Sequence, residues 1–253
     1  MESGVLHVIG MPIGNKDDIS QRSIDVIKNA KRIVVEQESI FRHNCRHLYN
    51  INMQDDVEII EIVYTKELDH ELDKIDMLID LLKNGEDIFL VSDEGMPGIA
   101  DPGGHLIKAA IRNNIRVTSS PGPSSIMAAI TVAGCDNGFS FEGFLPFNQQ
   151  HRMHSWEINK TKEKPMMFLL QNKEMNTDPN ISGNFSSHIF DFLKEAIDAL
   201  GTKRQAVLCY NLTQNNEEIF RGTLKELYEK LSAMPRIDGN CCIVIYGTDG
   251  SFR

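Results

Sequence analysis

The stretch "LVSDEGMPGIADPGG", residues 90–104, sets the interpretation of the chain. The apolar run at residues 88–91 predicts the end of a buried strand. Four glycines and two prolines follow within residues 92–104, and a helical pattern resumes at His105. Because proline restricts the backbone and glycine frees it, this composition predicts a long loop of defined shape between a strand and a helix.

Two more loops of the same kind follow apolar runs in this half of the chain. They are "GMPIGN", residues 10–15, and "SSPGPSS", residues 119–125. In a parallel sheet such loops gather at the carboxyl ends of the strands, where open α/β folds bind ligands. Any one loop is weak support, since ordinary turns also need glycine and proline. The three together predict a small-molecule site.

Strand and helix patterns alternate along the first half, which favours a mostly parallel α/β sheet. Strands are expected within residues 5–9, 32–38, 84–92 and 115–123, and helices after a cap at Asp18 or Ser20 and at residues 69–82 and 104–114. The second half is also α/β but with more adjacent strands, at residues 138–146, 164–171, 204–212 and 241–247, and with helices at residues 189–200 and 223–231. A change of pattern near Pro121 predicts two domains, residues 1–120 and 121–253. The polar segment 172–188 is expected to be an exposed loop.

Composition limits the function classes. The chain has 253 residues and a formal net charge of −10, which argues against broad adhesion to nucleic acid or to anionic membranes but allows a local basic site. No apolar run approaches the ~20 residues that span a bilayer, and the N-terminus lacks the features of a secretory signal. We therefore expect a cytoplasmic protein that does not enter a membrane.

Neither the cysteines nor the histidines indicate a metal site. The five cysteines, Cys45, Cys135, Cys209, Cys241 and Cys242, form no C-x-x-C pair, so buried thiols are favoured over a disulfide framework or a zinc site. His43 and His47 have i, i+4 spacing but lack the glutamate of a zincin motif. No metal is expected.

The loops also restrict the ligand. The chain has neither a G-x-G-x-x-G fingerprint nor a G-x-x-x-x-G-K-[ST] phosphate loop. Its central loop instead carries Asp93, Glu94 and Asp101. Such a loop suits a ligand with positive charge and hydroxyl groups better than a pyrophosphate.

Several motifs then carry a resemblance to a known family. "GMPIGNKDDISQRS", "VSDEGMPGIADPGG", "SSPGPSS", "FEGFLP" and "FRGTLKEL" occur in order between about residues 5 and 247. In these motifs the chain resembles the tetrapyrrole methylase-like family, the class III S-adenosylmethionine-dependent methyltransferases. It is most similar to the branch that 2'-O-methylates a cytidine of small-subunit (16S) ribosomal RNA. The resemblance implies two α/β domains with the cofactor cleft between them, and a homodimer.

The resemblance also implies which residues hold S-adenosylmethionine. The positions that match are Pro12, Ser92, Asp93, Glu94, Gly95, Met96, Ile99, Ser124 and Ser125 in the loops, and Leu169, Leu170, Asn211, Leu212, Thr213, Cys241 and Cys242 in the second domain. For the second group, packing at the ends of strands is an equally good interpretation.

The chain departs from the ribosomal branch on the side of the substrate. It has "EQES", residues 36–39, where that branch usually has E-D-T-R, and "QNKEM", residues 171–175, where it usually has Y-E-S-P-H-R. These departures leave open a methylase of a tetrapyrrole-like or other small molecule, or a cofactor-binding protein without RNA activity.

If RNA is the substrate, the chain must provide a base and a basic rim. A ribose hydroxyl has to lose its proton on methylation, and the candidate carboxylates are Glu36, Asp93 and Glu142. Contacts to RNA phosphates are expected from Arg42, Arg46 and Arg152, although a solvated helix surface explains these arginines equally well.

Overall fold

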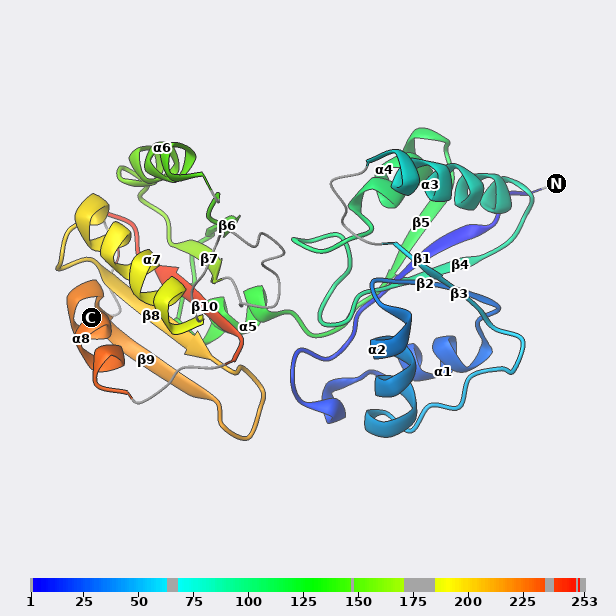
Figure 1. Cartoon of the computed structure of the whole chain (residues 1–253), viewed down its shortest axis with the longest axis horizontal. Coiled ribbons are helices and arrows are strands. Elements are labelled where there is room, and N and C mark those ends of the chain that lie inside the picture. Colours follow the sequence, from blue (N-terminus) through cyan, green and yellow to red (C-terminus); the bar gives the residue numbers. More distant parts are fainter. Residues whose placement is uncertain are drawn as a thin grey trace. The chain divides into compact units, whose positions relative to one another are not determined.

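The computed structural model describes residues 2–62, 68–146, 148–170, 185–234, 239–248 and 250. The chain divides into two compact units, Met1–Ser124 (unit 1) and Ser125–Arg253 (unit 2). Each unit contains one five-stranded sheet with helices packed against it (Figure 1). This architecture confirms the α/β class that the sequence predicts.

Unit 1 is built on an all-parallel sheet with the order β3-β2-β4-β1-β5. Its strands are β1 (Val5–Ile9), β2 (Arg32–Val35), β3 (Glu58–Glu61), β4 (Ile88–Val91) and β5 (Arg116–Ser120). β1 lies between β4 and β5, with His7 in register with both Phe89 and Thr118. Every loop that follows one of these strands therefore leaves the same edge of the sheet.

Helices cover both faces of this sheet, with α1 and α2 on one side and α3 and α4 on the other (Figure 1). The helical elements are η1 (Lys16–Asp18), α1 (Gln21–Asn29), α2 (Glu38–His43), the π-helical turn η2 (Asn44–Leu48), α3 (Leu68–Lys83) and α4 (Gly104–Arg112). Alternate strand residues explain the two cores: Leu6 and Val8 pack with α3 and α4, and Ile9 packs with α1 and α2. Ser20 caps α1, as predicted, by accepting a hydrogen bond from the amide of Ser23.

Unit 2 is built on a mixed sheet with the order β6-β7-β10-β8-β9. Its elements are α5 (Ser125–Val132), β6 (Ser140–Phe144), α6 (Gln149–Asn159), β7 (Met166–Leu170), α7 (Phe185–Leu200), β8 (Gln205–Tyr210), β9 (Glu218–Thr223), α8 (Leu224–Ser232) and β10 (Cys241–Ile245). The β6–β7 pair is parallel and the other pairs are antiparallel. Helices α6, α7 and α8 share a core with one face, and α5 packs against β10 and β7.

Some elements depart from the sequence prediction. β2 ends at Val35 rather than at residue 38, because α2 begins at Glu38. α7 begins at Phe185, so residues 185–188 are helical rather than part of a loop, whereas residues 172–184 lie outside the described residues. Periodicity did not identify β3, β9, α2, α5 or α6. Across the part of the chain that the structure describes, no helix has the length and apolar character needed to cross a bilayer.

Candidate functional site

The three loops rich in glycine and proline meet at the carboxyl edge of the unit 1 sheet. The amide of Met11 donates to the carbonyl of Gly95 at 2.8 Å, and the amide of Gly95 donates to the carbonyl of Pro12 at 3.4 Å. The amide of Gly10 donates to the carbonyl of Ser120 at 3.0 Å, so the third loop begins beside the first. The order of the sheet places β1 between β4 and β5, and the loops that follow these three strands therefore become neighbours.

Gly10 and Gly122 form the closest contact between two of these loops. A Cβ atom on Gly10 would lie 2.6 Å from the Cα and N atoms of Gly122 and 2.6 Å from the sulfur of Met96. A Cβ on Gly122 would lie equally close to the Cα of Gly10, at 2.6 Å. The buried hydroxyl of Ser23 on α1 holds the first loop from behind by donating to the carbonyl of Gly10 at 3.3 Å. Only glycine fits at both positions.

The central loop is shaped by residues with positive φ. Gly95, Gly98 and Gly103 have φ angles of 71°, 81° and 99°, and Ala100 has a φ of 61°. Glycine adopts this region without a steric cost, so the backbone conformation explains why three of the four loop positions with glycine carry that residue. The buried hydroxyl of Ser92 donates to the carbonyl of Glu94 at 2.9 Å and closes the first turn.

Four carboxyl groups interact beside this loop: Glu36 directly after β2, and Asp93, Glu94 and Asp101 on the loop itself. We call them the carboxyl cluster. Desolvation raises the pKa of Glu94 to about 7, and the charges of Asp93 and Glu36 act in the same direction, although part of the Glu94 side chain is open to solvent. Desolvation likewise raises the pKa of Asp101 to about 7, with Glu36, Glu94 and Asp93 adding to the rise.

The other two members of the cluster shift in the same direction. Desolvation, and then the charge of Asp93, raise the pKa of Glu36. Desolvation also raises the pKa of Asp93, and a hydrogen bond from the backbone of Gln37 partly offsets that rise. Tyr49, just after η2, feels the same charges: desolvation, then Cys45, Glu94 and Asp93, raise its pKa to about 12. The cluster therefore favours a positively charged ligand.

Two polar atoms at this edge have no hydrogen-bond partner among the described residues. They are the Oδ1 atom of Asp93 and the hydroxyl of Ser120, and both are shielded from solvent. Buried polar groups are normally paired, so unpaired ones at a loop junction indicate a missing donor or acceptor. A ligand that carries hydroxyl or amino groups satisfies this requirement.

The remaining predicted residues of the loops lie around this junction. Pro12 is buried, Met96 packs partly against the core, and Ile99 is exposed on the outer part of the central loop. Ser124 ends unit 1, and Ser125 begins α5 in unit 2.

The predicted cofactor residues of unit 2 also gather at one edge of its sheet. Cys241 is in register with Leu170 on β7 and with Tyr210 on β8, and Cys242 is in register with Leu169 and Cys209. The end of β7, the start of β10 and the end of β8 therefore adjoin. Leu212 is buried just beyond β8.

The corner after β8 has an unusual backbone. Asn211 and Thr213 have positive φ angles of 47° and 69°, in a backbone region that residues other than glycine seldom adopt. The buried Asn211 is held twice: its amide donates to the carbonyl of Asn240 at 2.8 Å, and its side-chain oxygen accepts from the amide of Asn240 at 3.0 Å. Such strained positions concentrate at functional sites.

The candidate base Glu142 is in unit 2, whereas the carboxyl cluster is in unit 1. It belongs to β6 of unit 2, next to the irregular register between Phe141 and Gly143. Its carboxylate accepts a hydrogen bond from the ammonium group of Lys162 at 2.5 Å. A base engaged in this way is less available for proton transfer than Glu36 or Asp93.

The three candidate RNA contacts differ in their surroundings. Arg152 on α6 is partly buried and makes a two-pronged ion pair with Glu195, with its Nε and Nη2 atoms 3.0 Å from Oε1. Arg42 makes an exposed pair with Glu38, and such surface pairs are weak. Arg46 is exposed on η2 and makes no ion pair within the described residues.

Sequence reasoning missed Gly10, Gly122, Ser23 and Tyr49 as residues of this edge. Gly10 and Gly122 belong to the loops at residues 10–15 and 119–125, but nothing in their spacing along the sequence shows that their backbones touch. No group of three or more histidine, cysteine or acidic side chains within the described ranges has the arrangement of a metal site.

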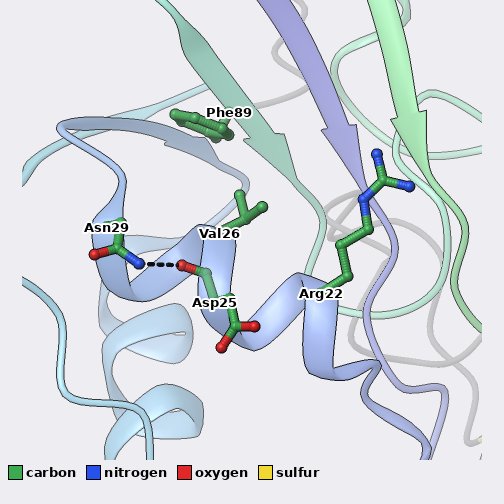
Figure 2. A pocket seen from close by; sticks show the side chains of 5 residues that line it. All are labelled: Arg22, Asp25, Val26, Asn29 and Phe89. Carbon is green, nitrogen blue, oxygen red and sulfur yellow. Dashed lines mark hydrogen bonds between the residues drawn. The ribbon is translucent and has the colours of Figure 1, made fainter.

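A separate hollow of about 470 Å³ lies beside α1 and is lined by Arg22, Asp25, Val26, Asn29 and Phe89 (Figure 2). We call it the α1 hollow. It shares no lining residue with the three loops or with the carboxyl cluster.

Comparisons with known proteins agree with the geometry of both sheets. A family model described as Tetrapyrrole (Corrin/Porphyrin) Methylases matches residues 5–228. A protein of Vibrio cholerae named Ribosomal RNA small subunit methyltransferase I is 32% identical over 226 residues, covering 88% of this chain and 70% of that protein. A protein of the same name from a Hydrogenobaculum species is 30% identical over 241 residues, covering 95% and 94%. The structure of the methyltransferase CobJ matches with a TM-score of 0.64 at 16% identity, over 97% of this chain and 95% of that one, and this likeness concerns the fold.

Proposed function

Because the chain belongs to the tetrapyrrole methylase family, we propose that it transfers a methyl group from S-adenosylmethionine to a ribose 2'-hydroxyl of small-subunit ribosomal RNA. The family is one of S-adenosylmethionine-dependent methyltransferases, and the ribosomal substrate follows the relatives at about 30% identity. The proposal includes action in the cytoplasm.

The observation that carries the proposal is the junction of the three loops beside the carboxyl cluster. Unpaired atoms of Asp93 and Ser120 there suit a ligand with hydroxyl or amino groups. The carboxylates suit its positive charge. We assign Pro12, residues 92–96, Ile99 and Ser124–Ser125 to binding of S-adenosylmethionine, together with Leu169–Leu170, residues 211–213 and Cys241–Cys242 of unit 2.

When bound, S-adenosylmethionine supplies a methyl group on a positively charged sulfur and needs no metal for its transfer. The chain's own residues then have to hold the acceptor hydroxyl in line and remove its proton. Glu36 and Asp93 are the candidates for the base, because they lie in the cluster and have raised pKa values. Glu142 is less suitable because it holds Lys162.

Methyl transfer from labelled S-adenosylmethionine to isolated small ribosomal subunits tests the proposal. A 2'-O-methylated ribose has lost the hydroxyl that attacks the neighbouring phosphate, so the product must resist alkaline cleavage at one nucleotide. Label in a metabolite extract but not in RNA would instead support a small-molecule methylase. Transfer to neither, with the cofactor bound, would leave a binding protein.

We expect the double variant Arg42→Ala/Arg46→Ala to lose RNA affinity without losing cofactor affinity. Each lost phosphate contact should flatten the salt dependence of RNA binding by about one unit of logarithmic slope on a duplex, and by somewhat less on a single strand. Arg152 is left out because Glu195 occupies its guanidinium. Binding titrations between low and moderate salt provide the measurement.

Arg112→Ala is the matched control for this pair, since Arg112 is an exposed arginine on α4, on the opposite face of the unit 1 sheet. It should keep the wild-type slope. If the salt dependence of RNA binding keeps its slope in the double variant, Arg42 and Arg46 do not contact the RNA. That result concerns RNA binding alone and not methyl transfer.

We also propose that the chain forms a homodimer, as its family generally does. Light scattering at tens of micromolar protein should give twice the 28.6 kDa mass of one chain. A single-chain mass at that concentration would contradict this part of the proposal.

A further inference from the structure

The α1 hollow lies beside a row of side chains that crosses the unit 1 sheet. Phe89 on β4, His7 on β1 and Thr118 on β5 occupy register positions on the same face. The rings of His7 and Phe89 are stacked, with centroids 4.7 Å apart and an angle of 13° between their planes. Both residues are only partly buried, so this part of the face is less covered than the core beneath α1.

The row is held rigidly. The Nδ1 atom of His7 lies 2.9 Å from the hydroxyl of Thr118, and its Nε2 atom lies 3.7 Å from a carboxylate oxygen of Asp87. The other carboxylate oxygen of Asp87 accepts from the amide of Val5 at 2.7 Å. The imidazole therefore supports the Phe89 ring from one side in a fixed orientation.

The hollow lies in front of the phenylalanine ring. Figure 2 shows Phe89 and Val26 turned toward the same space, with Arg22 at one end and Asn29 at the other. A volume of about 470 Å³ falls within the range of small-ligand sites. A flat ring that stacks on Phe89 fits such a space. The side-chain nitrogen of Asn29 donates to the carbonyl of Asp25 at 2.7 Å, and the side-chain oxygen of Asn29 can accept a hydrogen bond from the edge of that ring.

One arginine, Arg22, lines the hollow and places a positive charge at one end of it. Arg22 is exposed in the first turn of α1 and makes no ion pair with any residue that the structure describes. Asp25 also lines the hollow, and one of its carboxylate oxygens accepts a hydrogen bond from the side-chain amide of Gln21 at 2.8 Å. A ligand with a flat ring and a negative charge could stack on Phe89 and pair with Arg22.

We propose that the α1 hollow binds an unpaired nucleotide of the RNA substrate, with the base stacked on Phe89 and a phosphate near Arg22. This inference rests on the proposed function, because it takes RNA as the substrate. Proteins commonly bind unpaired RNA by stacking its bases on aromatic side chains and holding its phosphates with arginine. The hollow is separate from the loops that we assign to S-adenosylmethionine, so it adds a second contact for the RNA.

The test uses the full-length protein and a fluorescent single-stranded oligocytidylate of about 12 nucleotides, a length within the usual range for such sites. Phe89→Leu keeps an apolar side chain but removes the ring, and it should weaken binding by about tenfold. Arg22→Gln should weaken binding and reduce its salt dependence. A duplex of the same length should bind less well to the wild type and should respond little to Phe89→Leu, because its bases are already stacked.

Phe89→Trp gives a direct readout. The ring is retained, so affinity should be retained, and the new indole should be quenched when the oligonucleotide binds. Trp156, the one native tryptophan, is buried in unit 2 and contributes a constant background. Ile111→Ala and Arg112→Gln on α4 are the matched controls and should behave as the wild type.

Equal affinity of the wild type and Phe89→Leu for the oligonucleotide, or no quenching in Phe89→Trp, would overturn the inference. A change in the oligomeric state of Phe89→Leu or Arg22→Gln would also overturn it, by showing that a second copy of the chain covers this face. If the wild type methylates ribosomal RNA but Phe89→Leu and Arg22→Gln bind the oligonucleotide as the wild type does, the proposed function holds and only the role of the α1 hollow is refuted. Melting curves of each variant separate lost binding from lost folding.

Discussion

The variant Gly10→Ala should lose binding of S-adenosylmethionine and should unfold more easily than the wild type. Its Cβ atom would lie 2.6 Å from backbone atoms of Gly122 and from the sulfur of Met96. The methionine can turn away, but the backbone of the third loop cannot move without breaking the bond from Gly10 to Ser120. Overpacking of this kind costs about 1–3 kcal/mol. Calorimetry with the cofactor and denaturant unfolding measure the two effects.

Gly104→Ala is the control for this experiment. Gly104 begins α4, and a Cβ there would come no closer than 3.6 Å to another atom, without a positive φ. Alanine also favours the helix more than glycine does. Stability should therefore stay equal or rise, and binding should persist. If Gly10→Ala bound the cofactor like Gly104→Ala, the junction of the first and third loops would not form part of the site.

The second large effect concerns pH and the charge of the ligand. The pKa values of Glu94 and Asp101 are raised to about 7, so both groups are mostly protonated at pH 6 and mostly ionised at pH 8. Only the ionised forms attract a positive sulfonium. The affinity for S-adenosylmethionine should rise by about tenfold or more across this interval, as expected for a charge-assisted contact. The demethylated product lacks the positive charge, and its affinity should change far less.

Glu94→Gln and Asp101→Asn should each flatten the pH profile of the donor and leave that of the product in place. Glu157→Gln, an exposed carboxyl group on α6, should change neither profile. Parallel profiles for donor and product in the wild type would show that the carboxyl cluster does not sense the sulfonium.

The same raised pKa values predict how pH affects the stability of the free protein. In the unfolded chain these carboxyl groups ionise near pH 4, but in the folded state they ionise near pH 7. The favourable contribution is complete below the unfolded pKa and is lost as the pH rises through the folded pKa. The melting temperature without ligand should therefore fall between pH 5 and pH 8, and S-adenosylmethionine should raise it most at pH 8.

Local signals explain which parts of this molecule sequence reasoning could predict. Apolar runs such as residues 88–91 and punctuated loops such as residues 92–104 show the strands and the edge where ligands bind. β3 and β9 are harder to detect, because most residues of β3 are only partly buried and β9 occurs within a longer polar segment.

Contacts between distant residues explain what could not be predicted. Glu36 meets Asp93 only because β2 and β4 are neighbours in the sheet. In the same way, Arg152 forms its ion pair with Glu195 of α7, and no sequence signal near Arg152 predicts that partner. Residue type and spacing alone therefore overestimate how many charged groups are available to a substrate.

The position of β1 between β4 and β5 has a consequence for how unit 1 folds. β1 is the first strand made, yet both of its neighbours come more than about 75 residues later in the chain. During synthesis β1 has no strand partner until β4 is complete at residue 91, and its other edge stays unpaired until β5 is complete at residue 120. Pairings over such separations form slowly and leave strand edges open to aggregation. Since the loops after β1, β4 and β5 come together only in that last step, a fragment that ends before β5 cannot assemble their junction. Ligand binding therefore reports that the whole of unit 1 has folded.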